Sequence, residues 1–460
     1  YTQLGDFSLA RLHIILKTTP GKIPKYNLKK IESDLIKVTR SWYDELRQEL
    51  IALYSADKAE FLYERFRGAF MPAYQDTFDV VQAIEDIENL EKTLKSGRLS
   101  MQLYRPAHAK SGEIRFKVFH PDQPIPLSNV LPMLENMGLK VLDEHPFAIK
   151  PRVSGKNLIM IHDFGLRTRN RSEVKLENIH LKFKEAFSQI WSGEVESDGF
   201  NALVLLAGLD WRDVMVLRAC CKYLRQAGIA FSQQYMEQTL CNNPFFSVQL
   251  IELFKARFDP RSNVLEKKIF RRLLSMLEKI QSADEDRILR RYMNLIMSML
   301  RTNFFQSLNG SPKRYLSFKL DSEKVDELPL PRPLREIFVY SARFEGVHLR
   351  FGMVARGGLR WSDRREDFRT EILGLVKAQQ VKNTVIVPVG SKGGFVLKSP
   401  PEIFDRQALF QEGVECYKLF ISGMLDLTDN LQENAVIPPK DTIRKDKDDP
   451  YLVVAADKGT

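Results

Sequence analysis

The residues best suited to chemistry in this sequence lie between Gly352 and Gly394. Two glycine pairs occur in this stretch, and each stands beside cations, in the segments Arg356–Arg360 and Lys392–Gly394. Because glycine has no side chain, the backbone there can approach a ligand closely, and neighbouring cationic groups can converge on an anion together with backbone N–H groups. The stretch therefore predicts a binding site for a small anionic molecule.

Lys392 could also take part in a reaction. It follows the apolar run Thr384–Val389, which predicts a buried strand. A lysine that is shielded from water and surrounded by cations holds its proton less tightly, so its neutral amine can act as a base or nucleophile. Arg356 and Arg360 could provide those cations and also bind carboxylates through paired N–H groups. An exposed lysine in a turn explains Lys392 equally well.

Common nucleotide and metal motifs are absent from the sequence. A P-loop requires G-x-x-x-x-G-K-[ST], whereas Lys392 precedes its glycine pair. The dinucleotide fingerprint G-x-G-x-x-G does not follow any predicted strand. Cys220, Cys221, Cys241 and Cys416 form no C-x-x-C pair and have no histidine at zinc spacing. We therefore expect no metal, and a reducing, cytoplasmic environment.

Strands and helices alternate around the glycine pairs, which predicts an α/β domain. The predicted strands are Tyr315–Leu320, Ile337–Ser341, Val347–Phe351, Thr384–Val389, Phe395–Lys398 and Tyr451–Ala456, and the predicted helices are Glu366–Lys382 and Phe404–Leu427. We expect Asp363 to cap the first of these helices, Trp361 to pack in the core and His348 to be structural.

The preceding part of the chain predicts a mixed region and then a helical one. A strand is predicted at Leu9–Lys17, and helical spacing extends from Leu28 to Lys95. A β-β-α-β-β order follows, with strands Leu99–Tyr104, Glu113–Phe119, Leu139–Asp143 and Leu158–Phe164, and a helix Pro126–Met137 that Gly138 ends. From Leu176 to about Asn303 the spacing is helical, until Asn309–Pro312 breaks it.

Composition and charge fit a soluble protein of two to four domains. The chain has 460 residues, of which 44% are hydrophobic and 28% charged. No apolar run approaches the roughly 18 residues of a membrane span. The net charge of +10 comes from Lys and Arg mixed with acids, not from a basic stripe with aromatics. We therefore expect neither a membrane nor a nucleic-acid partner, and both chain ends are interpreted as cuts through a larger polypeptide.

The residues Arg356-Gly-Gly-Leu-Arg360, Leu373-Gly374, Lys392-Gly-Gly and Ala456-Asp457 resemble the substrate-binding domain of glutamate dehydrogenases. The stretch from Leu349 to Val396 more closely resembles the very large bacterial NAD-dependent branch. The specific resemblance covers about residues 340–460, whereas residues 1–330 resemble that branch only in layout.

The implied fold is α/β and multi-domain. Residues 1–95 would form a strand-plus-helix unit, residues 96–170 a module similar to the ACT domains that often bind amino acids, and residues 171–312 a helical connector. Residues 313–460 would form the substrate-binding catalytic domain, truncated before the NAD domain. A purely structural spacer explains the ACT-like pattern equally well.

The resemblance also implies roles for individual residues. Lys392 matches the family's catalytic lysine, which activates the water that attacks the iminium carbon. Asp457 matches the catalytic aspartate, which moves protons to and from the substrate amine. Arg356 stands where the family usually has a lysine that grips the side-chain carboxylate, so the charge is kept and the geometry changes. The substrate would also be lined by three glycines, Gly357, Gly358 and Gly393.

The family's remaining lysine, which holds the α-carboxylate, has two candidates. Lys382 lies seven residues after Leu375 and hence on the same helical face. Lys377 is the second candidate, and ungapped spacing from Lys392 would select Gln380 instead. A solvated lysine at the helix end explains Lys382 almost as well.

The implied reaction is the reversible oxidative deamination of L-glutamate to 2-oxoglutarate and ammonia, with hydride passing to NAD. NAD would be bound mainly by a domain outside this chain, so we expect the fragment alone to be inactive. The resemblance also implies a homo-oligomer and amino-acid effectors. Two alternatives stay open: an amino-acid-sensing regulatory protein, and a dehydrogenase for Leu or Phe. Arg356 favours an acidic substrate, since a buried cation facing an apolar group would be unpaired.

Overall fold

The computed structural model describes residues 2–3, 11–12, 21, 26–39, 41–152, 158–169, 176–382, 389–399, 405–433 and 435–457. The chain divides into two compact units, which are described separately. The first comprises Tyr1–Ser100, Phe119–Gln123 and Pro146–Ile161, and the second comprises Met101–Val118, Pro124–His145 and His162–Thr460.

The first unit is mainly helical, as the spacing from Leu28 to Lys95 predicts. Its helices are α1 (Leu28–Thr39), α2 (Trp42–Leu53), α3 (Ala56–Phe66), α4 (Pro72–Thr77) and α5 (Val80–Ser96). Ser41 and Asp44 form a capping box at the start of α2, and Gly97 ends α5 in the left-handed conformation. A short pair, β1 (Thr2–Gln3) and β2 (Arg11–Leu12), contains part of the predicted strand Leu9–Lys17, whose other residues lie outside the described ones.

A four-stranded sheet has residues in both units. It consists of β3 (Ser100–Tyr104), β4 (Glu113–Pro121), β5 (Leu139–Ile149) and β6 (Ile159–Thr168), in the order β3-β4-β6-β5. Helix α6 (Leu127–Asn136) lies between β4 and β5 in sequence and is followed by Gly138 at φ +84°. The predicted β-β-α-β-β order is therefore confirmed, although β5 and β6 extend several residues beyond the predicted strands.

The second unit begins its helical part after β6. Its helices are α7 (Leu176–Trp191), η1 (Gly199–Ala202), α8 (Leu203–Leu206), α9 (Trp211–Gln226), α10 (Gln233–Asn242), α11 (Pro244–Phe258), α12 (Glu266–Leu277) and α13 (Ala283–Ser298). The helical prediction up to Asn303 is wrong at its end, because Met299–Thr302 form strand β7, which pairs with a strand of the next domain. Beyond it, Asn309 and Gly310, both at positive φ, turn the hairpin of β8 (Ser307–Leu308) and β9 (Ser311–Pro312).

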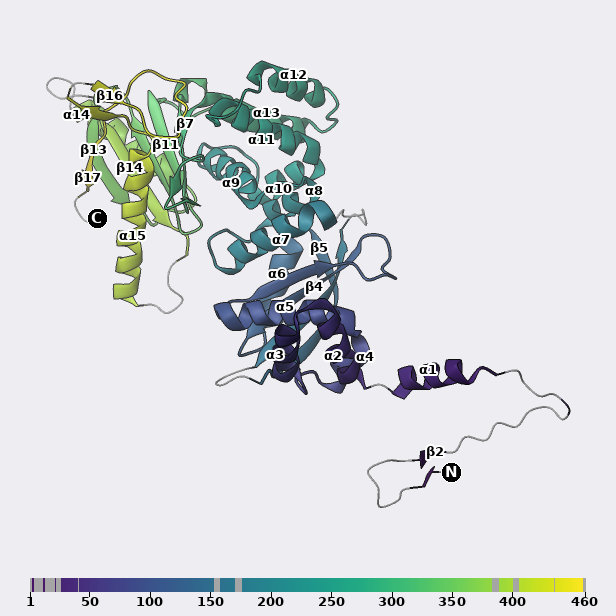
Figure 1. Ribbon diagram of the computed structural model, residues 1–460. Coiled ribbons are helices and arrows are strands. Elements are labelled where there is room, and N and C mark those ends of the chain that lie inside the picture. The colour runs from purple at the N-terminus through teal and green to yellow at the C-terminus, as the bar shows by residue number, and fades with distance from the viewer. Residues whose placement is uncertain are drawn as a thin grey trace. The chain divides into compact units, whose positions relative to one another are not determined.

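A seven-stranded mixed sheet follows, in the order β17-β13-β14-β12-β11-β10-β7 (Figure 1). Its strands after β7 are β10 (Leu316–Leu320), β11 (Arg335–Tyr340), β12 (Phe344–Arg350), β13 (Arg356–Trp361), β14 (Ser391–Leu397) and β17 (Val453–Ala456). Strand β13 is parallel to both β14 and β17, and the other pairs are antiparallel. A separate short hairpin joins β15 (Asn430–Gln432) and β16 (Ala435–Ile437).

Helices α14 (Phe368–Lys382) and α15 (Arg406–Leu425) cover opposite faces of this sheet. A Cβ added to Gly394 of β14 would meet Ile372 of α14. The next residue, Phe395, packs its ring against Phe420 of α15. Because successive side chains of a strand point to opposite faces, Lys392 lies on the α14 face together with Gly394.

One local prediction in this domain is wrong, and another lies mostly outside the described residues. In addition, Arg356–Trp361 is a strand that the sequence did not predict, and the strand predicted at Phe395–Lys398 begins earlier, at Ser391. Asp363 does not cap α14, since the helix begins only at Phe368 and Asp367 directly precedes it. The predicted strand Thr384–Val389 lies, except for its last residue, outside the described residues.

Two predictions for single residues are confirmed. Trp361 packs against the core, with its ring stacked on Phe395 at 6.1 Å between centroids. His348 lies within β12, is 3% exposed and is a core residue of the sheet. None of the helices in the described part of the chain has both the length and the apolarity needed to cross a bilayer.

Buried His348 makes the stability of the fold depend on pH. Burial, and secondarily the charge of Arg350, lowers the pKa of the His348 imidazole to about 3. The unfolded chain, with a histidine pKa near 6.5, binds the proton first as the pH falls, so protonation favours unfolding below about pH 6.5. Between pH 6.5 and 5 this group should lower the free energy of unfolding by about 2 kcal/mol.

Urea unfolding followed by tryptophan fluorescence at pH 7 and 5 measures this effect. His348→Leu, which cannot titrate, should lose about 2 kcal/mol less stability over this range than the unsubstituted chain. Equal losses in the two proteins would show that His348 is protonated as easily in the fold as in the unfolded chain.

Candidate active site

The amine of Lys392 and the carboxylate of Asp457 form an ion pair. Lys392 Nζ lies 2.9 Å from both carboxylate oxygens, and the two side chains are 19% and 24% exposed. Lys392 comes from the second residue of β14, and Asp457 directly follows β17. The backbone N–H of Asp457 donates to the carbonyl of Leu359 on β13, which lies between those two strands. The sheet thus brings together two residues that are 65 positions apart in sequence.

The glycine pair of β13 is what allows this contact. A Cβ at Gly358 would stand 1.4 Å from Asp457 Oδ1, and a Cβ at Gly357 would stand 1.6 Å from the carbonyl oxygen of Ser391. Glycine at position 358 therefore leaves the space that the Asp457 carboxylate fills. Glycine at position 357 allows β14 to approach β13 closely. Contacts within the protein therefore require glycine at both positions.

The surroundings of Lys392 are not wholly cationic, as the sequence suggested. Its amine is in direct contact with the carboxylate of Asp457. Arg360, expected beside Lys392, pairs instead with Glu371 of α14 at 2.9 Å. An exposed arginine, Arg356, remains as the candidate for gripping a substrate carboxylate.

Arg356 shares the face of the sheet that carries the ion pair. In β13, Leu359 packs in the cluster beneath α15, so Gly358 and Arg356 point to the other face, that of α14. Asp457 fills the space in front of Gly358, and Lys392 lies on the same face. A guanidinium, an amine and a carboxylate therefore stand on one face of the sheet, where β17, β13 and β14 are neighbours.

Helix α14 carries the two candidates for the α-carboxylate. Lys377 lies within the helix and is exposed. Lys382 is its last residue, and the side chain of Lys382 lies outside the described residues. The side chain of Gln379 was missed by the sequence interpretation, which reached the neighbouring Gln380 through ungapped spacing. Its Nε2 donates to the carbonyl of Arg356 at 3.4 Å, while its buried Oε1 accepts no hydrogen bond from the described residues.

Tyr417 of α15 is a second residue that the sequence did not single out. Its ring packs against Phe395 with 6.0 Å between centroids. Burial, and secondarily the negative charge of Asp457, raises the pKa of the Tyr417 phenol. The phenol is therefore protonated near neutral pH and lies within the electrostatic reach of Asp457. A half-buried tyrosine in a helix carries no sequence signal that separates it from a core residue.

The N-terminus of α14 is anchored by α9 of the helical part. The Gln226 side chain accepts a hydrogen bond from the N–H of Arg369 at 3.2 Å and donates to the carbonyl of Arg365 at 2.9 Å. The guanidinium of Arg369 pairs with Glu336 of β11, which also accepts from Tyr223 at 2.9 Å. All three of these side chains are buried. The helix that carries Lys377 and Lys382 is thereby fixed from two sides.

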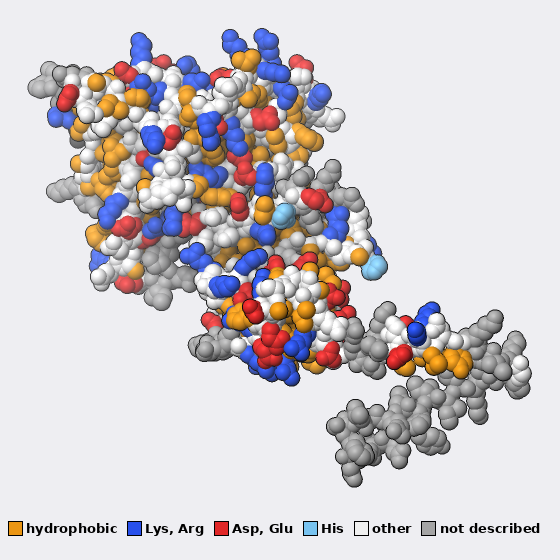
Figure 2. Space-filling view, in the orientation of Figure 1, with side chains coloured by type: hydrophobic (Ala, Val, Ile, Leu, Met, Phe, Trp, Pro, Cys, Tyr) orange, Lys and Arg blue, Asp and Glu red, His pale blue; other side chains and the backbone are white. Residues whose placement is uncertain are grey.

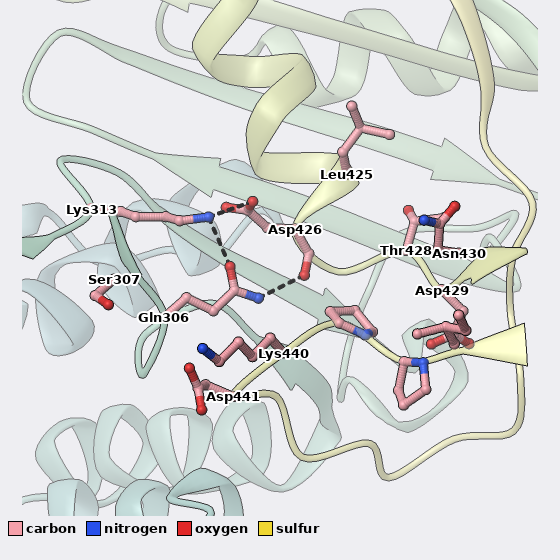
Figure 3. Close-up of a pocket in the computed structure, with 13 residues that line it drawn as sticks. Gln306, Ser307, Lys313, Leu425, Asp426, Thr428, Asp429, Asn430, Lys440 and Asp441 are labelled. Atoms are coloured by element: carbon pink, nitrogen blue, oxygen red, sulfur yellow. Dashed lines mark hydrogen bonds and ion pairs between the residues drawn. The ribbon is translucent and has the colours of Figure 1, made fainter. Parts of the chain in front are cut away.

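A hollow of about 660 Å³ lies elsewhere in this domain and is lined by residues other than Lys392 and Asp457 (Figure 3). Its polar groups bind one another: Lys313 Nζ lies 2.5 Å from Asp426 and 2.8 Å from Gln306, whose own amide donates to the carbonyl of Asp426. These three side chains are thus already engaged within the protein.

Among the described residues we find neither a cluster of metal ligands nor, at the glycines of β14, a phosphate loop. A search of them for three or more metal-binding His, Cys, Asp or Glu side chains finds no group. The glycines of β14 do not form a phosphate loop, because a Cβ at Gly393 would meet Leu359 and one at Gly394 would meet Ile372. These glycines pack against the protein's own side chains. In the view of Figure 2, positive and negative side chains are interspersed, without a basic stripe.

Five family models match the chain in succession, and the descriptions of all five name glutamate dehydrogenase. They are the ACT2 domain over residues 1–43, helical motif 2 over 49–93, the ACT3 domain over 98–179, helical motif 3 over 195–260, and the bacterial NAD-glutamate dehydrogenase catalytic domain over 272–460. The expected fold class, α/β and multi-domain with an ACT-like module, is confirmed by these matches and by the sheets and helices of the structure.

Three similar proteins carry the name NAD-specific glutamate dehydrogenase. The one from Halomonas elongata is 46% identical over 463 residues, which cover 100% of this chain and 28% of that protein. The one from Pseudomonas aeruginosa is 43% identical over 100% of this chain and 29% of that protein. The one from Mycobacterium tuberculosis is 44% identical over 96% of this chain and 28% of that protein. The chain thus spans less than a third of these relatives' length, and over that span it belongs to the bacterial NAD-dependent glutamate dehydrogenase family.

Proposed function

We propose that this chain is the part of an NAD-dependent glutamate dehydrogenase that binds L-glutamate and 2-oxoglutarate. The observation that carries the proposal is the pair of Lys392 and Asp457, an amine and a carboxylate 2.9 Å apart, on the sheet face that also carries Arg356. In the proposed reaction, glutamate loses a hydride from Cα and a proton from nitrogen. Water then adds to the resulting iminium carbon, and ammonia leaves to give 2-oxoglutarate.

Each group of the pair has a separate proton to move in this proposal. Asp457 exchanges protons with the substrate nitrogen, which is a cation before oxidation and leaves as ammonia. The Lys392 ammonium first passes a proton to the Asp457 carboxylate, and its neutral amine then takes a proton from the water that attacks the iminium carbon. General acid–base catalysis requires each group within about 3 Å of its proton, and the direct contact of the two side chains keeps both near one substrate carbon.

Three cationic residues are proposed for the substrate carboxylates. Arg356 grips the side-chain carboxylate, because its side chain is exposed and, among the described residues, forms an ion pair with no acidic side chain. Lys382, or alternatively Lys377, holds the α-carboxylate from α14. Gly357, Gly358 and Gly393 line the site by keeping the strands close together.

NAD supplies the hydride acceptor of the proposed reaction. Since the glycines of β14 are packed against Leu359 and Ile372, we assign no contact with NAD to this chain and propose that it is bound mainly by other parts of the enzyme. The family resemblance also supports a homo-oligomeric, cytoplasmic enzyme with amino-acid effectors. It further supports the division at residues 1–95, 96–170, 171–312 and 313–460.

Replacing Lys392 tests the proposed proton transfer. In the intact enzyme, Lys392→Ala should lower kcat for glutamate with NAD by about 10²- to 10⁴-fold, the range of a lost general base. Lys313→Ala is the matched control, because Lys313 is also a half-buried lysine paired with an aspartate, Asp426. It should keep wild-type kcat. Undiminished turnover by the Lys392 variant would refute the proposed function, provided that circular dichroism shows both variants folded.

Replacing Arg356 tests the substrate class. Arg356→Met should lower kcat/KM for glutamate by about 10- to 100-fold, the value of a charge-assisted hydrogen bond of about 1.5–3 kcal/mol. It should lower kcat/KM for leucine little or not at all. The control Arg364→Met removes an exposed arginine of the adjacent segment that pairs with Asp367 and should change neither. Equal losses for glutamate and leucine, or a wild-type enzyme that prefers leucine, would favour a dehydrogenase for apolar amino acids.

A further inference from the structure

The strand that leads to Asp457 has little support of its own. Strand β17 has four residues, pairs only with β13 in the described sheet and lies at its edge. Val453 is 47% exposed, and Ala455 and Ala456 are exposed as well. An edge strand with few buried side chains is readily displaced. The position of Asp457 therefore depends on what holds the chain just before β17.

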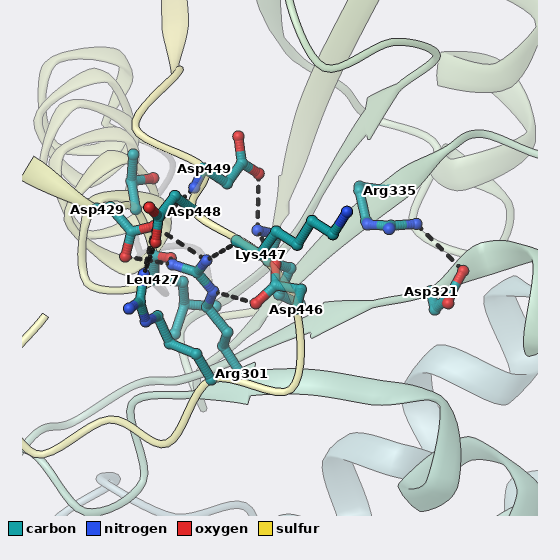
Figure 4. Close-up of polar contacts among 12 residues, drawn as sticks. Arg301, Asp321, Arg335, Leu427, Asp429, Asp446, Lys447, Asp448 and Asp449 are labelled. Atoms are coloured by element: carbon teal, nitrogen blue, oxygen red, sulfur yellow. Dashed lines mark hydrogen bonds and ion pairs between the residues drawn. The ribbon is translucent and has the colours of Figure 1, made fainter. Parts of the chain in front are cut away.

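A network of buried charges holds that preceding segment (Figure 4). Arg301 of β7 donates to Asp446 at 2.7 Å and to the carbonyl of Lys447 at 2.9 Å. Lys319 of β10 lies 2.5 Å from Asp446 and 2.7 Å from Asp449. These acidic and basic side chains are at most 6% exposed. Two neighbouring strands of the sheet thus clamp the segment that runs toward β17.

Arg350 of β12 adds the contact closest to Asp457 in sequence. Its guanidinium donates to both carboxylate oxygens of Asp449 and to the carbonyl of Tyr451 at 2.8 Å, two residues before β17 begins. In the sheet register Arg350 stands opposite Ser391, the residue before Lys392. One side chain therefore links the strand beside Lys392 to the segment that delivers Asp457.

The link acts from the face of the sheet opposite the ion pair. Arg350 is the register partner of Ser391, whereas Lys392 is the partner of Leu349, and adjacent residues of a strand point to opposite faces. Arg350 thus cannot touch a substrate bound at Lys392. It can act only by fixing the backbone that carries Asp457.

Stability alone is a weak reason for such a network. Burying ions removes them from water, and well-packed apolar side chains in their place are often equally or more stabilising. Charged groups with several directed hydrogen bonds, however, fix one arrangement of the backbone. The bidentate pair, with its additional bond to a carbonyl, is suited to this second role.

We propose that Arg350 and Asp449 are positioning residues, which set the distance between Lys392 and Asp457 from behind the sheet. This inference rests on the proposed function of that pair. A displacement of about 1 Å at a reacting group can lower the rate by up to about 100-fold. Loss of the link should therefore affect the chemical step more than substrate binding, since the Arg350 side chain lies on the face of the sheet opposite Arg356 and α14.

Two variants of the intact enzyme test the proposal. Arg350→Lys keeps a charge for Asp449 but cannot also form the bidentate pair and the bond to the Tyr451 carbonyl. The double variant Arg350→Gln with Asp449→Asn removes both charges together, so neither charge is left buried without its partner. Lys319 keeps its ion pair with Asp446 in this variant. The matched control is Arg218→Gln with Asp198→Asn, which neutralises another buried arginine–aspartate pair, in the helical part.

Steady-state kinetics with glutamate and NAD, with pH profiles of kcat, separate positioning from stability. The double variant should lower kcat by about 10- to 100-fold, change KM less than about threefold and alter the pH profile, because the distance between the Lys392 amine and the Asp457 carboxylate is no longer fixed. Arg350→Lys should give a smaller loss of the same kind. The control should lower the urea midpoint of unfolding but keep the wild-type kcat and pH profile.

Each other outcome has a definite meaning. Wild-type kcat and pH profile in the double variant, or in Arg350→Lys if the double variant does not fold, would overturn the positioning role. An equal loss of kcat in the control would show that the effect follows stability only, and would also overturn it. If Lys392→Ala itself keeps full turnover, the proposed function fails first, and the two failures are thereby distinguishable.

Discussion

The ion pair of Lys392 and Asp457 depends on space that a single missing side chain provides. Because Gly358 has no Cβ, the carboxylate can lie against β13 and reach the amine at 2.9 Å. The order of the strands brings the two groups together, since β13 lies between β14, which carries Lys392, and β17, which ends just before Asp457. An amine and a carboxylate held in this way are only partly exposed, so their interaction is screened less than that of a surface pair. The proposed chemistry depends on this arrangement.

The groups proposed to react and the buried charges that hold the chain lie on opposite faces of the sheet. The α14 face carries Arg356, Lys392 and Asp457, while the α15 face carries the buried charges that hold the segment before β17. Helix α14 is in turn anchored by Gln226 of α9. The helical part and the catalytic part of the second unit are therefore joined at the helix where the substrate's α-carboxylate is proposed to bind.

The sequence predicted the elements well and the contacts poorly. Periodicity identified most strands and helices, because burial alternates with two or about 3.6 residues. It failed at Met299–Thr302, which form a strand because they pair with β10. It also failed at Asp363, because α14 begins only at Phe368, five residues after the expected cap. The local pattern singled out Lys392, but Asp457 was found only through resemblance, because nothing local joins residues 65 positions apart. Of the two cations expected around Lys392, Arg360 pairs instead with Glu371 on a neighbouring helix.

The carboxylate of Asp457 occupies the space in front of Gly358 and contacts the amine of Lys392 from there. The proposed proton transfers depend on this position. The most direct test is Gly358→Ala in the intact enzyme, since the added methyl group would stand where Asp457 Oδ1 lies. The account predicts a folded enzyme whose kcat for glutamate falls by at least about 100-fold, with KM changed far less. Wild-type kcat in a folded Gly358→Ala enzyme would contradict it.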